Sequence, residues 1–305
     1  MIPNRWQPRD ACRVRAALAE AGCEAPQTRD GHWRLAEGNG PGRATTATVV
    51  GGWLRLDGSL GDGPLPPRRG LERLWYLVEA NARLPGSVRF ALTPSRCMRV
   101  RAEVPLDDGV DLGLRASEAL EGIRVATDLW RDQQALGPGG EQAGQPSAPS
   151  GADGALVGQV KSLCKEVGWE TTERASGTLA VALEVSGEPY RGRIETSGGR
   201  VAVRADLAQA GDLARLCRDA WAVLLLTACG VVRLARGSGG SRDGRWAAWV
   251  EVAWPGLPSA AELGHGLAAC SVACELLGRE VTVLKEEEMA ERFLRVRGWS
   301  VSRTS

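Results

Sequence analysis

Two stretches of this chain share one pattern and decide its fold: MRVRAEVPLDDGVDLGLRASEALEGIRVATDLW (residues 98–130) and RWAAWVEVAWPGLPSAAELGHGLAACSVACELL (residues 245–277). Each begins with apolar residues at every second position, which is typical of a half-buried β-strand. Each then passes through a turn with proline and glycine into an alanine-rich segment with apolar residues at helical spacing. The two stretches lie 147 residues apart in a chain of 305, so they indicate one structural unit written twice.

The residues around these stretches follow the same order in both halves. The glycine pairs Gly51-Gly52 and Gly198-Gly199 favour hairpin turns between strands. A middle helix follows in each half, and its apolar stripe recurs at an offset of 142 residues. The predicted elements of the first half are a helix near 12–19, strands near 33–35, 45–50 and 54–60, a helix at 71–78, strands at 87–92 and 97–104, and a helix at 116–130. Those of the second half are a helix at 156–167, strands at 179–185, 190–196 and 201–207, a helix at 213–220, strands at 231–235 and 245–254, and a helix at 263–277.

The element order in each half is therefore αβββαββα. Consecutive strands joined by short turns predict an antiparallel sheet, and alternation along them predicts helices on one face. We expect an α+β fold of two tandem αβββαββα units, each an antiparallel sheet packed against helices. Residues 132–153 are rich in Gly, Pro, Gln, Ser and Ala, so they are predicted to form a flexible linker between domains 1–131 and 154–305.

Composition and charge narrow the class of protein. Hydrophobic residues make up 43% of the chain and charged residues 25%, as in soluble globular proteins. The net charge of +1 gives no electrostatic reason to bind nucleic acid or a membrane. The N-terminus lacks the apolar core of a signal peptide, and the longest apolar run, 220–232, is too short to span a bilayer. We therefore expect a cytoplasmic protein.

Residues that could carry catalysis or bind a metal are few. The two histidines, His32 and His265, lie at non-equivalent positions of the two halves and outside any Cys/His ligand spacing. Cys270 and Cys274 are spaced as two metal ligands on a helix, but they occupy the stripe that faces the core in the other copy. We expect all eight cysteines to be reduced thiols, without a metal or a cofactor.

Two glycine-rich segments, 37–42 and 237–244, also need an interpretation. Neither has the strand–loop–helix context or the Gly-Lys-Ser/Thr ending of a phosphate-binding loop. Both are predicted to be hairpin loops, and no catalytic residue is assigned.

Tryptophan is the informative residue type, with 11 copies against two phenylalanines and two tyrosines. Alternation along 245–254 places Trp249 on the face that carries Arg101 in the first copy. A large aromatic side chain there is expected to be covered by the other half, another chain or a bound segment, or to be buried incidentally. Trp53 is placed on the corresponding outer face, so Trp249, Trp53 and Arg101 are the candidate partner-binding residues. The cationic segment 293–299 is expected to be a packed or frayed end, or a partner contact.

The element order and the unit length of about 130 residues, together with the lack of a catalytic constellation, resemble the type III secretion chaperone-like fold. This fold includes the secretion chaperones of the CesT/Tir-chaperone type and the YbjN-like proteins. The resemblance covers residues 10–131 and 154–285. It implies a small, non-enzymatic and commonly homodimeric protein, and secretion chaperones of this kind hold an unfolded effector segment. In one chain, the two units would dock as an intramolecular pseudo-dimer, or exchange units in a homodimer.

We therefore expect a non-enzymatic protein-interaction module, a chaperone or adaptor that binds a protein or peptide segment through a sheet face, a sheet edge or a helix groove. An alternative is an accessory or regulatory subunit of a bacterial defence, stress or signalling complex. A further alternative is an enzyme with an unrecognised site between the halves.

Overall fold

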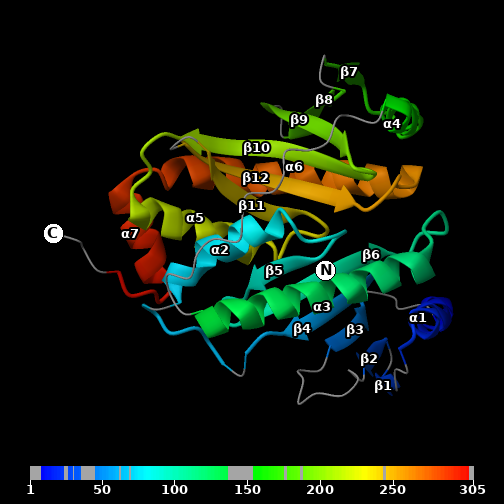
Figure 1. Ribbon diagram of the computed structural model, residues 1–305, viewed down its shortest axis with the longest axis horizontal. Helices are drawn as coiled ribbons and strands as arrows, with labels where there is room; N and C mark the ends of the chain where they lie inside the picture. Colours follow the sequence, from blue (N-terminus) through cyan, green and yellow to red (C-terminus); the bar gives the residue numbers. More distant parts are fainter. Residues whose placement is uncertain are drawn as a thin grey trace.

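The structure is a computed structural model that describes residues 8–23, 27–29, 31–35, 45–61, 63–68, 70–136, 154–174, 177–185, 188–242 and 245–301. Within these residues the chain forms two similar halves, each with an antiparallel sheet of six strands and several helices (Figure 1). The predicted α+β fold of two tandem units is confirmed.

The described part of the first half contains three helices and six strands. In chain order these are α1 (Pro8–Glu20), β1 (Gln27–Arg29), β2 (His32–Leu35), β3 (Thr45–Val49), β4 (Trp53–Ser59), α2 (Leu71–Asn81), β5 (Arg89–Leu92), β6 (Met98–Pro105) and α3 (Leu112–Leu136). The strand order in the sheet is β1-β2-β3-β4-β6-β5.

The second half repeats this order and adds a helix at its end. Its elements are α4 (Gly154–Glu166), β7 (Thr171–Glu173), β8 (Leu179–Val185), β9 (Glu188–Ser197), β10 (Arg200–Ala210), α5 (Arg215–Ala228), β11 (Arg236–Arg242), β12 (Arg245–Trp254), α6 (Ala260–Val283) and α7 (Glu287–Val296). The sheet has the order β7-β8-β9-β10-β12-β11, which matches the first sheet strand for strand.

Each unit carries one more strand than the predicted order αβββαββα. The extra strands, β1 and β7, are three residues long and pair antiparallel with the start of β2 and β8. Three residues are too few to show an alternating pattern, which is why the sequence does not reveal them.

The penultimate strand of the second half lies where a loop was predicted. Residues 231–235 connect α5 to β11, and the glycine-rich segment expected to be a loop supplies β11 itself. An added Cβ at Gly237 would lie 2.8 Å from the carbonyl oxygen of Leu225, and one at Gly239 would lie 2.8 Å from the Trp75 ring. The helices therefore pack directly on the backbone of β11, and this contact selects glycine over the apolar residues typical of strands.

The middle helices correspond in a different register from the predicted offset of 142. Asn81 at the end of α2 accepts from the amide of Phe90 at 2.7 Å, and Cys229 after α5 accepts from the amide of Gly237 at 3.1 Å. These equivalent contacts place the two helices at an offset of 147–148 residues, like the other elements. A helical stripe matches itself after a few residues, so apolar spacing alone does not fix its register.

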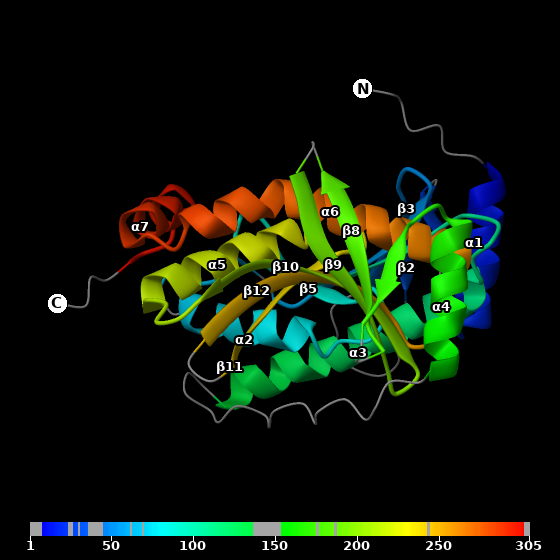
Figure 2. The same ribbon diagram turned by 90° about the horizontal axis from the view of Figure 1, so that it is seen from above.

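The halves pack through their middle helices and inner strands. α2 packs against α5, α2 also packs on β11, and α5 packs on β5. Figures 1 and 2 show α3 and α6 on opposite sides of the molecule, each covering one face of its own sheet. The predicted linker began at residue 132, whereas α3 continues to Leu136 because Gln133–Leu136 are good helix formers. Residues 137–153 lie outside the described residues.

Candidate functional site

The two halves meet through an exchange of arginine side chains. Arg89, at the start of β5, is fully buried and donates through Nε to the carbonyl oxygen of Cys229 at 2.9 Å. Its Nη2 donates to the carbonyl oxygen of Val232 at 3.2 Å and to the carboxylate of Glu103 at 2.6 Å. Both carbonyl groups belong to the loop 229–235 of the second half, so this loop lies against the charged face of the first sheet.

Arg236, at the start of β11, makes the equivalent contacts in the opposite direction. Its Nη1 donates to the carbonyl oxygens of Leu84 at 2.6 Å and Gly86 at 3.3 Å, both in the loop 82–88 of the first half. Its Nε donates to the carboxylate of Glu251 at 2.8 Å. Each half therefore inserts one buried arginine into the other, and the two contacts form a reciprocal pair.

The carboxylate of Glu103 is strongly stabilised in its charged form. Burial alone would raise its pKa, but the charges of Arg89 and Arg55 and the amide of Leu234 lower it to about 2. Burial lowers the pKa of Arg236, although its carboxylate partner opposes this change. The interface therefore holds two buried ion pairs, and the arginine of each pair also donates to backbone carbonyl groups of the other half, which offsets the cost of burying the charge.

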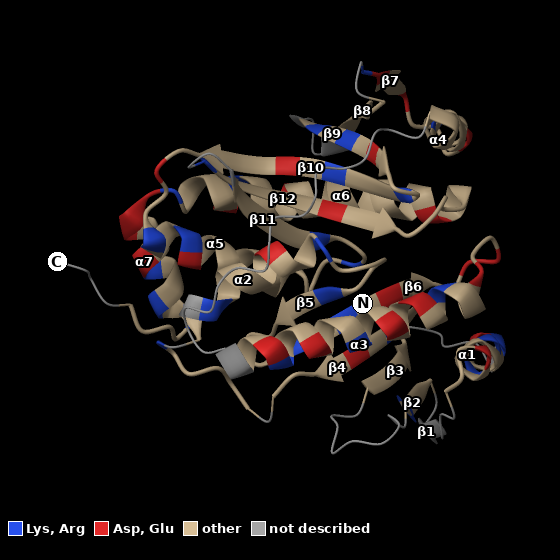
Figure 3. Cartoon of the chain, viewed as in Figure 1, with Lys and Arg blue, Asp and Glu red and all other residues tan. Residues whose placement is uncertain are grey.

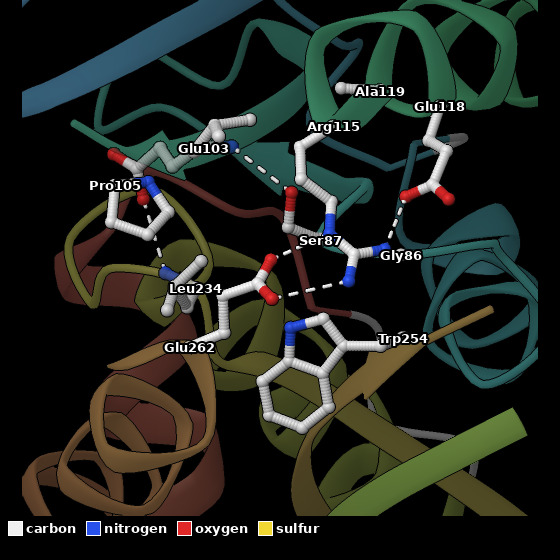
Figure 4. Close-up of a pocket in the computed structure, with 11 residues that line it drawn as sticks. Gly86, Ser87, Glu103, Pro105, Arg115, Glu118, Ala119, Leu234, Trp254 and Glu262 are labelled. Carbon is white, nitrogen blue, oxygen red and sulfur yellow. Dashed lines mark hydrogen bonds and ion pairs between the residues drawn. The ribbon is translucent and has the colours of Figure 1, made fainter. Parts of the chain in front are cut away.

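A small pocket lies beside this network, between the two halves (Figure 4). Arg115 of α3 and Glu262 of α6 point toward one another across it, with 2.6 Å between Nε and Oε1. Arg115 also donates to Glu118 at 2.8 Å, and the ring of Trp254 lies beside Glu262. The pocket has about 30 Å³ open to small groups, enough for about two water molecules.

Each charged side chain that lines this pocket forms an ion pair with another side chain of the protein. Arg115 pairs with both Glu118 and Glu262, while Glu103 pairs with Arg89 and Arg55. Glu262 also accepts from the amide of Ser259 and closes the first turn of α6 as a capping box. These ion pairs hold the first turns of α3 and α6 next to the two sheets. The carboxylates of Glu103, Glu118 and Glu262 are each balanced by an arginine.

Two of the candidate partner-binding residues lie at the contact between the halves. Arg233 of the loop 229–235 stands 5.5 Å over the ring of Trp53, and His265 of α6 meets the same ring edge-on at 5.0 Å. Arg101 donates to the carbonyl oxygen of Gly230 at 2.5 Å. The outer sheet face near Trp53 and Arg101 is therefore occupied by the second half.

Trp249 lies apart from these two, on the outer face of the second sheet. It is 8% exposed, and the guanidinium of Arg204 from the neighbouring strand β10 lies 3.7 Å over its ring. Its Nε1 donates to Glu251 at 3.3 Å. The cover of Trp249 thus comes from within its own sheet, through a cation–π contact, and corresponds to incidental burial in its own half. The three candidates are not gathered on one exposed surface.

The two histidines, which the sequence offers as possible catalytic or metal-binding residues, both contact polar side chains. His265 Nε2 lies within hydrogen-bonding distance of the Asp107 carboxylate of the first half, and His32 Nδ1 lies 3.2 Å from the hydroxyl of Thr48. Among the described residues, no group of three or more His, Cys, Asp or Glu side chains is arranged to hold a metal ion. The glycine-rich segment 37–42 lies outside the described residues.

Cys270 and Cys274 are buried between α6 and the second sheet. Burial raises the pKa of Cys270 well above its usual value, and that of Cys274 to about 12. Such thiols are neutral and poorly nucleophilic at pH 7, so they act as small apolar side chains.

An apolar stripe runs along the outer side of α6. Val272, Leu276 and Val283, here called the α6 stripe, are between 43% and 51% exposed. The equivalent positions of α3 carry Val125, which is also exposed, and Leu129, which is partly buried. Figure 3 shows charged residues of both signs along α3, whereas α6 is mostly uncharged. The first two stripe positions are therefore apolar in both copies, and the helix around them carries fewer charges in the second copy.

α6 is the one described helix that is long and apolar enough to cross a membrane by length and composition alone. Its inner side is packed on the second sheet, where Leu263, Leu267 and Cys270 are inaccessible to solvent. This packing is that of a core helix, with a second apolar side left open to solvent.

The sequence contains a signal for the arginine exchange that its interpretation missed. Arg89 and Arg236 lie 147 residues apart, and Glu103 and Glu251 lie 148 apart. Opposite charges repeated at equivalent positions of predicted strands indicate a contact shared by both copies. The displaced strand prediction at 231–235 hid the match, because it placed Arg236 in a loop.

No family model, curated protein or solved structure matches this chain. Its function is therefore inferred from the surfaces and contacts described above.

Proposed function

We propose that this protein is a cytoplasmic, non-enzymatic protein-interaction module whose partner docks on the α6 stripe. The proposal also takes the chain to be a tandem relative of the type III secretion chaperone-like proteins. Two docked α+β units with a reciprocal interface support that reading, because dimers of single units are the usual arrangement in that family.

The other surfaces considered for a partner are used within the molecule. The loops 82–88 and 229–235 contact the charged faces of the opposite sheets, and α2 and α5 pack on the inner strands β11 and β5. A sheet face or an inner sheet edge is therefore less available than a helix surface. The α6 stripe is the observation that carries the proposal, because half-exposed branched residues on one helix side are typical of docking by another amphipathic segment.

A binding role also agrees with the chemistry of the pocket between the halves. A general acid or base needs a perturbed group that is free to exchange a proton with a substrate. Glu103, Glu118 and Glu262 are each held by arginine, so the pocket is suited to holding the halves together.

The proposal is tested by comparing three full-length baits in cells of the source organism: wild type, Leu276→Lys and Val231→Lys. Val231 is more exposed than Leu276 and lies away from the α6 stripe, so Val231→Lys controls for the added charge. We expect a partner that the wild type and Val231→Lys recover and that Leu276→Lys loses by at least about tenfold. Identical recovery by all three folded baits contradicts docking on α6.

The recovered partner also separates the two binding roles. An unfolded segment that is protected from proteolysis in the complex identifies a chaperone. A folded enzyme recovered in a fixed ratio identifies an accessory subunit of a larger complex.

A further inference from the structure

The C-terminal segment after α7 crosses from the second half to the first. α7 packs on α5 through its buried residues Ala290, Phe293 and Leu294. Residues 297–301, here called the tail, then reach the first half beside the start of α2 (Figure 1). The described residues of the first half contain no equivalent of α7 or of the tail.

One side chain anchors the tail. Trp299 is 3% exposed, whereas Arg297, Gly298 and Ser300 beside it are exposed. Its ring lies against Gly70, where an added Cβ would come within 3.0 Å of it. A buried aromatic residue between exposed neighbours is the pattern of a binding hot spot.

The first half supplies polar contacts on both sides of this anchor. Arg96 donates through Nη1 to the carbonyl oxygen of Gly298, and its guanidinium lies 5.7 Å from the centre of the Trp299 ring. After the anchor, the amide of Ser300 donates to the carbonyl oxygen of Pro67 at 3.2 Å. The first half therefore recognises the backbone before and after the tryptophan as well as its ring.

The slot is shaped by backbone positions that limit what can enter it. An added Cβ at Gly70 would lie 2.7 Å from the carbonyl oxygen of Pro66, so the floor of the slot has no room for a side chain. Gly298 has a φ of +74°, and a Cβ added to it would lie 3.3 Å from Nη1 of Arg96. The position before the tryptophan therefore favours glycine. Arg96 itself is held at φ of +62° by the turn from Thr93. Gly298 therefore serves two purposes, since it ends α7 in the left-handed conformation and leaves room for Arg96 beside the tryptophan.

We propose that this slot, formed by residues 65–68, Gly70 and Arg96, is a peptide-binding site for a Gly-Trp segment, and that the tail of the same chain occupies it as an intramolecular ligand. The residues on either side of Trp299 are exposed, and the amide of Trp299 donates to the carbonyl oxygen of Leu294 at 3.0 Å. Release of the tail from the slot therefore breaks this bond at the end of α7 and leaves the preceding turns of the helix in place. The same segment from a second copy of the chain fits the vacated slot. The tail then competes at the high effective concentration of a tethered ligand.

The test uses full-length Trp299→Ala, in which the tail remains but the anchor is absent. The probe is a fluorescent peptide of residues 295–303, RVRGWSVSR, with binding followed by anisotropy. We expect saturable binding to Trp299→Ala and at least about tenfold weaker binding to the wild type, whose own tail fills the slot. A peptide with alanine in place of the tryptophan is the matched control, and we expect it to bind at least about tenfold more weakly.

Two results overturn the proposal. One is no saturable binding to folded Trp299→Ala, and the other is equal binding of the two peptides. If Trp299→Ala does not fold, Trp299→Leu replaces it, because leucine keeps apolar contact with Gly70 while leaving part of the slot empty. Binding of the wild-type peptide to folded Trp299→Leu supports the proposal, and its absence overturns it.

Discussion

Arg89 and Arg236 occupy equivalent positions in the two halves, and each donates to backbone carbonyl groups of the half to which it does not belong. Each guanidinium is also paired with a buried carboxylate of its own sheet. Burying such groups is costly, so the pairs contribute to specificity through their geometry more than to net stability. The reciprocal contact defines one relative placement of the two sheets.

Removing one member of this exchange should destabilise the protein strongly. Arg236→Leu leaves Glu251 buried without its main partner and removes the arginine that donates to the carbonyl oxygens of Leu84 and Gly86. We expect a loss of about 3–5 kcal/mol in the free energy of unfolding, measured by urea denaturation. Arg124→Leu, which breaks an exposed pair with Glu121, should leave the urea midpoint close to that of the wild type. Equal effects would show that the buried exchange is unimportant for stability.

Stability should fall in acid because of Glu103. Its pKa is about 2 in the folded protein and 4.5 in its reference state, so it binds a proton more readily when the chain is unfolded. The stabilisation is therefore complete above about pH 4.5 and is lost as the pH falls toward 2, with a size on the order of 3 kcal/mol. Urea denaturation at pH 6, 4 and 2.5 measures the loss. Glu103→Gln should flatten this part of the profile, and an unchanged profile would contradict the assignment.

Thiol reactivity should divide the eight cysteines into two groups. Cys12 is exposed and Cys23 and Cys97 are partly exposed, so these three should react with a disulfide reagent in the folded protein. The five buried thiols should react only after unfolding, because burial raises their pKa and blocks access. Counting released chromophore before and after adding guanidinium tests this division. Fast reaction of more than three thiols in folded protein would contradict the packing of α6 and α5.

The glycine-rich strand β11 should not tolerate a side chain where the helices contact it. Gly237→Ala brings a Cβ within 2.8 Å of the backbone of Leu225, so the helix must move. We expect a loss of about 1–3 kcal/mol in the free energy of unfolding. Gly211→Ala is the matched control, since an added Cβ there meets nothing within 4 Å. A thermal melt in which both variants match the wild type would show that α5 is not packed on β11.

The sequence predicts the repeated architecture well because the apolar periodicity of each strand and helix recurs in the second half at an offset of about 147 residues. The strand and helix of 98–130 and 245–277 appear as β6 with α3 and as β12 with α6. The sequence does not predict β11 because Gly237 is needed for close packing of α5 and Gly239 for close packing of α2. Contacts with distant helices leave no alternating apolar pattern within the strand itself. The interface between the halves is not predicted for the same reason. Arginine is usually a surface residue, and Arg89 and Arg236 are buried only because the other half covers them.

The alternating pattern along residues 245–254 predicts the face on which Trp249 lies but not what covers it. It indicates correctly that Trp249 shares a side of its strand with Glu251, and the two are hydrogen-bonded. It does not identify the cover, because Arg204 comes from a strand far away in sequence. Trp53 and Arg101 are likewise placed by contacts with the loop 229–235 that no local pattern encodes.

The pair Arg115 and Glu262 has a consequence for self-association. The two residues are equivalents of one another, so they lie where a matched pair of units would meet around a two-fold axis. Two copies of the first unit would bring arginine against arginine there, and two copies of the second would bring glutamate against glutamate. Like charges at that point disfavour both identical pairings, whereas the unlike pairing gains an ion pair. The ion pair therefore favours docking of a first unit on a second unit, whether the two belong to one chain or to two.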